Sequence, residues 1–265
     1  MFVAGKNVQN EYGGTVFGPQ LGGKKRKKRS TEIMPISSEN KAKTCTIKDY
    51  PHSNLYAPTG ALINKSPLIC GGSVGGPVLK ECYQYDKSKE EWVLLAKMKT
   101  ARVLSASCPM LTGLFITGGQ PDSGLDGMNN RYDSTEFIWP NGTVTAGPPL
   151  PEPRSQHCMV AVSTTQAIIL GGRSRSHQEG QRSVIVFDVL TKTYKTSGVP
   201  LMNNFRPYLG CALIKKSPMH GNRPVVLAIG GNYRTSAEVY DFTQPNASWE
   251  DSKHLGFFLI LFLVP

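Results

Sequence analysis

The chain has 265 residues, a length that fits one large domain or two ordinary ones. Hydrophobic residues make up 39%, and 27 glycines and 19 prolines are spread along the chain, which predicts many short strands joined by turns and little helix. The formal net charge of +11 raises nucleic acid as a partner, but a little over half of the excess lies within residues 1–50. We therefore expect no nucleic-acid partner.

Residues 1–50 are rich in glycine, serine, asparagine and lysine and have little apolar periodicity, so they are predicted to be a basic, mostly disordered extension. The basic run Lys24–Arg29 has three open interpretations: a solvated charge block, a nuclear import signal, or a furin-type processing site before Ser30. Residues 1–14 show no apolar core of a secretory signal. Localisation stays open: cytoplasmic if the N-terminus is complete, with an extracellular site as the alternative.

From Pro51 onward, a short apolar run that ends in a glycine pair recurs about every fifty residues. The pairs are Gly71-Gly72, Gly118-Gly119, Gly171-Gly172 and Gly230-Gly231. Such a period is typical of a repeat architecture. The pattern divides residues 51–250 into four repeats, at about 51–98, 99–150, 151–200 and 201–250.

Each repeat is predicted to be a four-stranded antiparallel meander. In the third repeat, a strand follows Pro153, a second one ends at Gly171, a third runs over 183–188, and Tyr194 lies on the fourth. Large aromatic residues recur on the third and fourth strands of the repeats: Tyr85, Trp92, Phe137, Phe187, Tyr194, Tyr240 and Trp249. In the second repeat, Asn141-Gly142 is predicted to form a hairpin turn.

These residue types have structural roles. Glycine adopts a positive φ and lets another backbone approach closely, so a glycine pair permits a sharp exit from a strand where sheets crowd together. The aromatic rings supply flat surfaces that pack one sheet on the next. Since a single four-stranded sheet cannot bury both faces, successive repeats must stack.

Residues 251–265 form an apolar tail. The ten residues from Gly256 to Pro265 are too few for a membrane-spanning helix, which needs about twenty. We therefore expect no membrane partner.

The ordered glycine pairs, the aromatic third strands and the initial Arg102, Arg154 and Arg206 resemble the Kelch repeat family over about residues 51–249. The resemblance implies an all-β, Kelch-type β-propeller of about four four-stranded blades. Kelch propellers commonly have six blades, so we expect an open arc or an incomplete ring, and a chain that is a fragment. An open arc exposes apolar faces on its first and last blades, which favours self-association through the unclosed edges.

No motif indicates catalysis, so we expect no enzyme, no cofactor and no bound metal. The six cysteines include no CxxC pair, and the five histidines are widely separated. The segment 71–76 is rich in glycine but lacks the lysine and the helix of a phosphate-binding loop. A galactose-oxidase-like enzyme stays a remote alternative, implied by the family resemblance alone.

The loops that follow the glycine pairs are the predicted partner-binding sites. The third loop contains Arg173, Arg175, His177 and Arg182, the fourth contains Arg234, and the second contributes Asp122 and Asp126. If these loops emerge on one face, the arginines can bind the carboxylates of an acidic peptide. The alternative is that they are ordinary solvated loop arginines.

We therefore expect a non-enzymatic protein–protein interaction module, as in Kelch substrate-recognition domains. The alternative is an extracellular adhesion or matrix-type propeller. It is favoured by three glycosylation sequons at Asn64, Asn141 and Asn246, although Pro67 disfavours the first. It is also favoured by the processing-like basic run and by Cys108, Cys158 and Cys211, which occupy similar first-strand positions. A disulfide between Cys70 and Cys82, which flank one loop, would support it, and free thiols throughout would exclude it.

Overall fold

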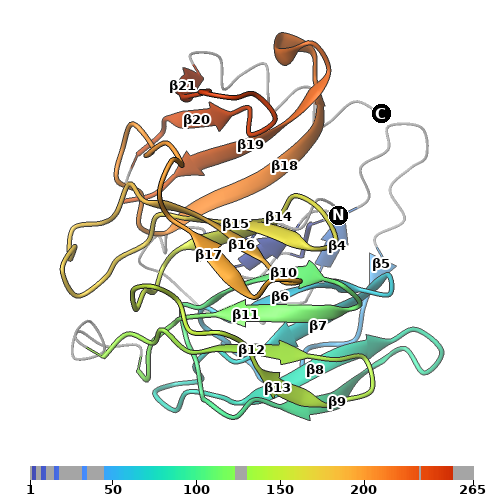
Figure 1. Ribbon diagram of the computed structural model, residues 1–265. Coiled ribbons are helices and arrows are strands. Elements are labelled where there is room, and N and C mark those ends of the chain that lie inside the picture. Colours follow the sequence, from blue (N-terminus) through green and yellow to red (C-terminus); the bar gives the residue numbers. More distant parts are fainter. Residues whose placement is uncertain are drawn as a thin grey trace.

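The computed structural model describes residues 47–122, 130–232 and 234–252 in full, and before residue 47 the backbone of five short strands. The residues form an all-β molecule with the blade arrangement of a β-propeller (Figure 1). Four antiparallel meanders follow one another, and we number them blades 1 to 4 in chain order. The prediction of four four-stranded, propeller-like blades is confirmed.

The strands of the blades have the following bounds. Blade 1 contains β6 (Thr59–Ile63), β7 (Ser66–Cys70), β8 (Glu81–Asp86) and β9 (Glu91–Lys97). Blade 2 contains β10 (Ala106–Met110), β11 (Gly113–Thr117), β12 (Thr135–Ile138) and β13 (Val144–Ala146). Blade 3 contains β14 (Cys158–Ala161), β15 (Gln166–Leu170), β16 (Val184–Asp188) and β17 (Thr193–Lys195). Blade 4 contains β18 (Leu209–Ser217), β19 (Arg223–Gly230), β20 (Ala237–Tyr240) and β21 (Trp249–Ser252), with a short 3-10 helix, Pro218–His220, between β18 and β19.

The predicted aromatic residues face one another across the third and fourth strands. Tyr85 pairs with Trp92, Phe187 with Tyr194, and Tyr240 with Trp249. In blade 2 the residue opposite Phe137 is Thr145, and Trp139 stacks on Phe137 instead. Asn141-Gly142 lies in the predicted turn, where the Gly142 N–H donates to the Trp139 carbonyl at 2.9 Å.

Apolar clusters fill the three junctions between neighbouring blades. Between blades 2 and 3, Phe115 stacks on Phe137 and on Phe187, with ring centroids 4.4 and 4.7 Å apart. Because the aromatic residues pack in the junctions between neighbouring blades, they stabilise the stack of blades.

A backbone ladder also joins the blades. One residue just before the first strand of each blade has a positive φ: Ala57, Leu104, Gln156 and Tyr208. The N–H of Leu104 donates to the Ala57 carbonyl at 3.2 Å. In the same way, Gln156 donates to the Leu104 carbonyl and Tyr208 to the Gln156 carbonyl, each at 2.9 Å. The left-handed conformation of leucine and tyrosine is costly, so these hydrogen bonds must hold it in place.

Within the described residues the four blades do not close into a ring. The face of blade 4 that points away from blade 3 is nevertheless buried. Val225 is fully buried there, and Leu227 and Val239 are 6% and 3% exposed. The expectation of an exposed apolar face on the last blade is therefore wrong.

Short strands lie in the N-terminal extension, where the sequence predicted none. They are β1 (Phe2–Val3), β2 (Asn7–Gln9), β3 (Thr15–Phe17), β4 (Glu32–Met34) and β5 (Cys45–Thr46). The hairpin β2–β3 joins the sheet of blade 4 at the free edge of β18, and β3 also contacts β6, β10 and β14. β1, β4 and β5 form a separate small sheet. The basic run Lys24–Arg29 lies outside the described residues.

Four cysteines form two disulfides, one within blade 1 and one between blades. Cys70 and Cys82 are directly opposite on β7 and β8, so the disulfide closes the loop between them. Cys158 of blade 3 is joined to Cys211 of blade 4. Cys108 is buried and unpaired, and burial raises the pKa of its thiol.

No described helix has the length and apolar character needed to cross a membrane. The apolar tail from residue 253 onward lies outside the described residues.

Candidate functional site

The candidate site is the end of the blades where the second strand of each blade leads into the third. In a meander this end also holds the segments that enter each first strand, so loops and linkers of all four blades meet there. In Figure 1 the loop between β15 and β16 projects to the left at this end. We call this surface the glycine-pair end.

Glycine pairs join each blade to the next one. The N–H groups of Gly72, Gly119 and Gly172 donate to the carbonyls of Arg102, Arg154 and Arg206 in the following blade, at 2.8, 2.9 and 3.0 Å. A Cβ on Gly71, Gly118 or Gly171, the first glycine of each of these three pairs, would lie 2.3–2.7 Å from the same carbonyl oxygen. A side chain is excluded there because another backbone occupies its place.

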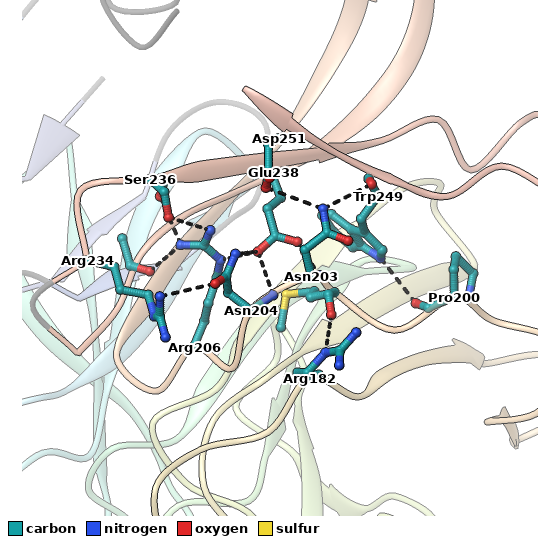
Figure 2. A network of polar contacts seen from close by, with 12 residues as sticks. Arg182, Pro200, Asn203, Asn204, Arg206, Arg234, Ser236, Glu238, Trp249 and Asp251 are labelled. Carbon is teal, nitrogen blue, oxygen red and sulfur yellow. Dashed lines mark hydrogen bonds and ion pairs between the residues drawn. The ribbon is translucent and has the colours of Figure 1, made fainter. Parts of the chain in front are cut away.

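The initial arginines are structural. Arg206 is fully buried, and its guanidinium donates to the carbonyls of Gly230 and Ser236 and to Glu238 Oε1 at 2.8 Å (Figure 2). Glu238 also accepts the backbone N–H groups of Asn203 and Asn204. Arg102 and Glu136 form the same arrangement in blade 2. Buried charges are tolerated because every group has a partner.

The sequence reasoning missed Glu136 and Glu238. The signal that marks them is a Ser-x-Glu triplet at the start of the third strand, Ser134 to Glu136 and Ser236 to Glu238. Blade 3 has Ser183 in the first position but Ile185 in the third.

Blade 3 therefore holds a buried arginine without the paired glutamate. Arg154 is 1% exposed and donates to the Gly171 carbonyl and the Ser183 hydroxyl, each at 3.2 Å, while its Nε has no hydrogen bond. Burial lowers the pKa of Arg154 to about 10, and the charge of Glu152 opposes this shift. Glu152 lies on the linker and accepts hydrogen bonds from Ser176 and Gln181.

A polar cluster lies at the glycine-pair end, close to the first strands of blades 3 and 4. Arg131 is 7% exposed and donates to the Ser155 hydroxyl at 3.0 Å and the Ser174 carbonyl at 2.8 Å. Burial and the neighbouring charge of Arg173 lower the pKa of Arg131. The guanidinium of Arg173 lies 5.8 Å above the Tyr208 ring, and its Nε is buried without a hydrogen bond.

Tyr208 contributes a hydroxyl group to this cluster. It shares a hydrogen bond with Tyr56 of blade 1, and burial raises its pKa to about 12. The cluster therefore joins residues of all four blades. It contains two neighbouring cations, Arg131 and Arg173, and two phenols, Tyr56 and Tyr208, which stay protonated at neutral pH. Such a surface attracts an anion.

The structure brings some predicted loop residues to this cluster and separates others from it. Arg173 lies in the cluster, paired through its backbone with Ser155. Arg175 is exposed. The other two have partners outside the cluster. Nδ1 of His177 lies 3.7 Å from Oε1 of Glu152, and Nε of Arg182 donates to the Met202 carbonyl.

The other predicted residues have different surroundings. Arg234 donates to the Asn204 side chain at 3.1 Å (Figure 2). Its guanidinium also lies 4.7 Å above the Phe205 ring, so both contacts tie Arg234 to the linker into blade 4. Asp122 accepts from the Gln120 side chain through its carbonyl oxygen. Asp126 lies outside the described residues. Sequence reasoning missed Arg131, Tyr56 and Tyr208, since no motif links them.

His157 is buried beside the cluster, with its Nε2 2.8 Å from the Thr117 hydroxyl and no partner for Nδ1. Burial and the charge of Arg154 lower its pKa, so the ring is neutral near pH 7. Among the described residues, no three histidine, cysteine, aspartate or glutamate side chains are grouped closely enough to hold a metal ion.

No protein-family model and no curated protein matches the chain. Among solved structures, its fold is similar to that of YjhT, with a TM-score of 0.58 and 16% sequence identity. The similarity is one of fold. The matched region covers 78% of this chain and 67% of YjhT. At 16% identity the similarity carries no information on activity.

Proposed function

We propose that the chain is a non-enzymatic, Kelch-type protein-interaction module that binds an acidic segment of a partner protein at the glycine-pair end. The repeat markers that resemble the Kelch family support this function. The observation that carries it is the position of Arg173 beside Arg131 and Tyr208.

The charge of this surface favours a carboxylate-rich ligand. Among the described residues, neither Arg173 nor Arg175 forms an ion pair. Arg173 is held by its backbone and by the Tyr208 ring, so little side-chain entropy is lost when a ligand binds. Arg175 lies two residues further along and is exposed, where it extends the positive surface.

A defined probe tests this function. A labelled oligoglutamate peptide is titrated into the full chain at low and moderate salt, with binding followed by fluorescence anisotropy. We expect the combined Arg173→Ala and Arg175→Ala variant to bind at least about tenfold more weakly, since two charge-assisted contacts are lost.

The matched control is Lys192→Ala with Lys195→Ala, which removes the same charge from exposed positions of blade 3 outside the glycine-pair end. The control should bind like the original chain. Equal weakening in both variants, or none in either, overturns the proposed site.

A second candidate function is favoured by the disulfides. Cys70–Cys82 and Cys158–Cys211 are bonds that persist in oxidising compartments, which supports an extracellular adhesion or matrix-type module. The number of reactive thiols in the denatured, unreduced protein tests this candidate.

A further inference from the structure

The three sequon asparagines lie together at the end of the blades opposite the glycine-pair end. Asn64 lies in the turn between β6 and β7, Asn141 in the turn between β12 and β13, and Asn246 in the turn between β20 and β21. All three are exposed. We propose that Asn141 and Asn246 carry N-linked glycans, an inference that rests on the extracellular candidate function.

The turn at Asn141 presents the sequon to solvent. The Thr143 N–H donates to Asn141 Oδ1 at 3.0 Å, which places the threonine beside the asparagine side chain. Thr143 is exposed as well, and the asparagine amide nitrogen has no hydrogen bond among the described residues. The acceptor nitrogen and the hydroxyl that the sequon requires are therefore both accessible.

The turn at Asn246 has the same character. Asn246 has a φ of 61°, and its side chain forms no hydrogen bond with the described residues. Ser248 is exposed, while Trp249 directly after it is buried and begins β21. A glycan on Asn246 extends into solvent without disturbing the packing of Trp249.

Asn64 differs from the other two because of Pro67. Ser66 begins β7 and pairs with Ile63, and the proline after it restricts Ser66 to extended conformations. This restriction also acts in the unfolded chain, so the serine hydroxyl cannot turn back toward the Asn64 amide. We assign no glycan to Asn64.

The two glycans lie away from the proposed binding surface. The turns of Asn141 and Asn246 follow third strands, whereas the loops that contain Arg173 and Arg234 precede them. Both glycans therefore leave the glycine-pair end uncovered, and removing them should leave oligoglutamate binding unchanged.

The deciding experiment uses the protein isolated from the cells that produce it. Enzymatic removal of N-glycans in heavy-oxygen water converts each occupied asparagine into a labelled aspartate, which mass spectrometry locates. We expect the label at positions 141 and 246 and none at position 64. Absence of label at 141 and 246 overturns the inference, and a label at 64 overturns the argument from Pro67.

Variants of the full chain directed into the secretory pathway of animal cells give an independent readout. Thr143→Ala and Ser248→Ala keep both asparagines, and each should remove one glycosidase-sensitive step in gel mobility. Asn222→Gln is the matched control, because Asn222 is an exposed, left-handed turn asparagine at the same end but is followed by Arg223 and Pro224. A mobility change in the control, or none in the two variants, contradicts the assignment.

The same native sample separates this inference from the candidate function on which it rests. Disulfides without glycans leave the extracellular function standing and overturn only the glycan assignment. Free thiols without glycans overturn both.

Discussion

At the scale of single residues, the first glycine of three pairs, Gly71, Gly118 and Gly171, is required by a neighbouring backbone as well as by its own backbone angle. Gly118 has a φ of 59°, and a Cβ there would lie 2.3 Å from the Arg154 carbonyl oxygen of the next blade. Gly230 has a φ of 69°, but its nearest described neighbour would be the Arg234 carbonyl oxygen at 3.6 Å. Two glycines with similar backbone angles therefore face different constraints.

This contrast predicts different costs for the same substitution. Gly230→Ala should lower the free energy of unfolding by about 1–2 kcal/mol, the cost of a left-handed alanine. Gly118→Ala should cost about 2 kcal/mol more, because the Arg154 backbone must also move. Urea unfolding of both variants measures the difference. Equal losses contradict the role of Gly118 as a joint between blades.

At the scale of the structural element, blades 2, 3 and 4 fix the entry of the first strand with a buried arginine, whereas blade 1 has Leu55 at the equivalent position. Blades 2 and 4 use an arginine on the linker and a glutamate on the third strand. Blade 3 has Ile185 in place of this glutamate. In blades 2 and 4 the backbone N–H of Lys99 or Asn203 donates to the glutamate, and the equivalent residue in blade 3 is Pro151, which has no N–H. The glutamate and one of its backbone donors are absent together in blade 3, and what remains unpaired is the buried Nε of Arg154.

Removal of one partner in blade 4 should therefore be costly. Glu238→Gln leaves Arg206 as an uncompensated buried cation, and we expect a loss of about 3 kcal/mol in the free energy of unfolding. Glu250→Gln is the control in the same blade, since its side chain is 69% exposed, and it should change stability by less than about 0.5 kcal/mol. Similar effects of the two variants would show that the buried pair contributes no more than a surface charge.

At the scale of the whole molecule, the disulfide between blades depends on which face of the sheet each cysteine occupies. Cys158 pairs with Leu170, directly before Gly171, whereas Cys211 pairs with Ala228, two residues before Gly230. This one-residue offset places the two cysteines on opposite faces of equivalent sheets, so they meet between neighbouring blades. Cys108 pairs with Phe115, three residues before Gly118, and packs near Met159. The sequence suggested that the three cysteines occupy similar positions, but the structure shows that they are not equivalent.

Loss of either disulfide should lower stability according to the length of chain it closes. The Cys158–Cys211 bond spans 53 residues and the Cys70–Cys82 bond spans 12, so chain entropy predicts losses of about 4 and about 3 kcal/mol. Paired serine variants compared by urea unfolding, with Cys108→Ala as a control that removes no disulfide, measure these losses.

The number of reactive thiols in the denatured, unreduced protein is the complementary measurement. At most two of the six cysteines should react, rising to six after reduction. Six reactive thiols before reduction would exclude both disulfides and the extracellular candidate function.

The candidate site was only partly predictable. Arg173 was found because it follows a glycine pair, and the meander order placed its loop at one end of the blades. Arg131, Tyr56 and Tyr208 come from three different blades, and their proximity depends on how neighbouring blades are rotated against one another. No spacing in the sequence encodes that rotation.

By itself, the sequence determined the repeat, the four meanders and the turns, because strand periodicity, glycine and proline act over a few neighbouring residues. Only the tertiary structure decided which loop arginines are exposed, that Arg102 and Arg206 need a glutamate and Arg154 does not, and which cysteines meet. These outcomes depend on contacts between residues about thirty to fifty positions apart. Such contacts are set by the packing of one blade on the next, which local conformational preferences do not specify.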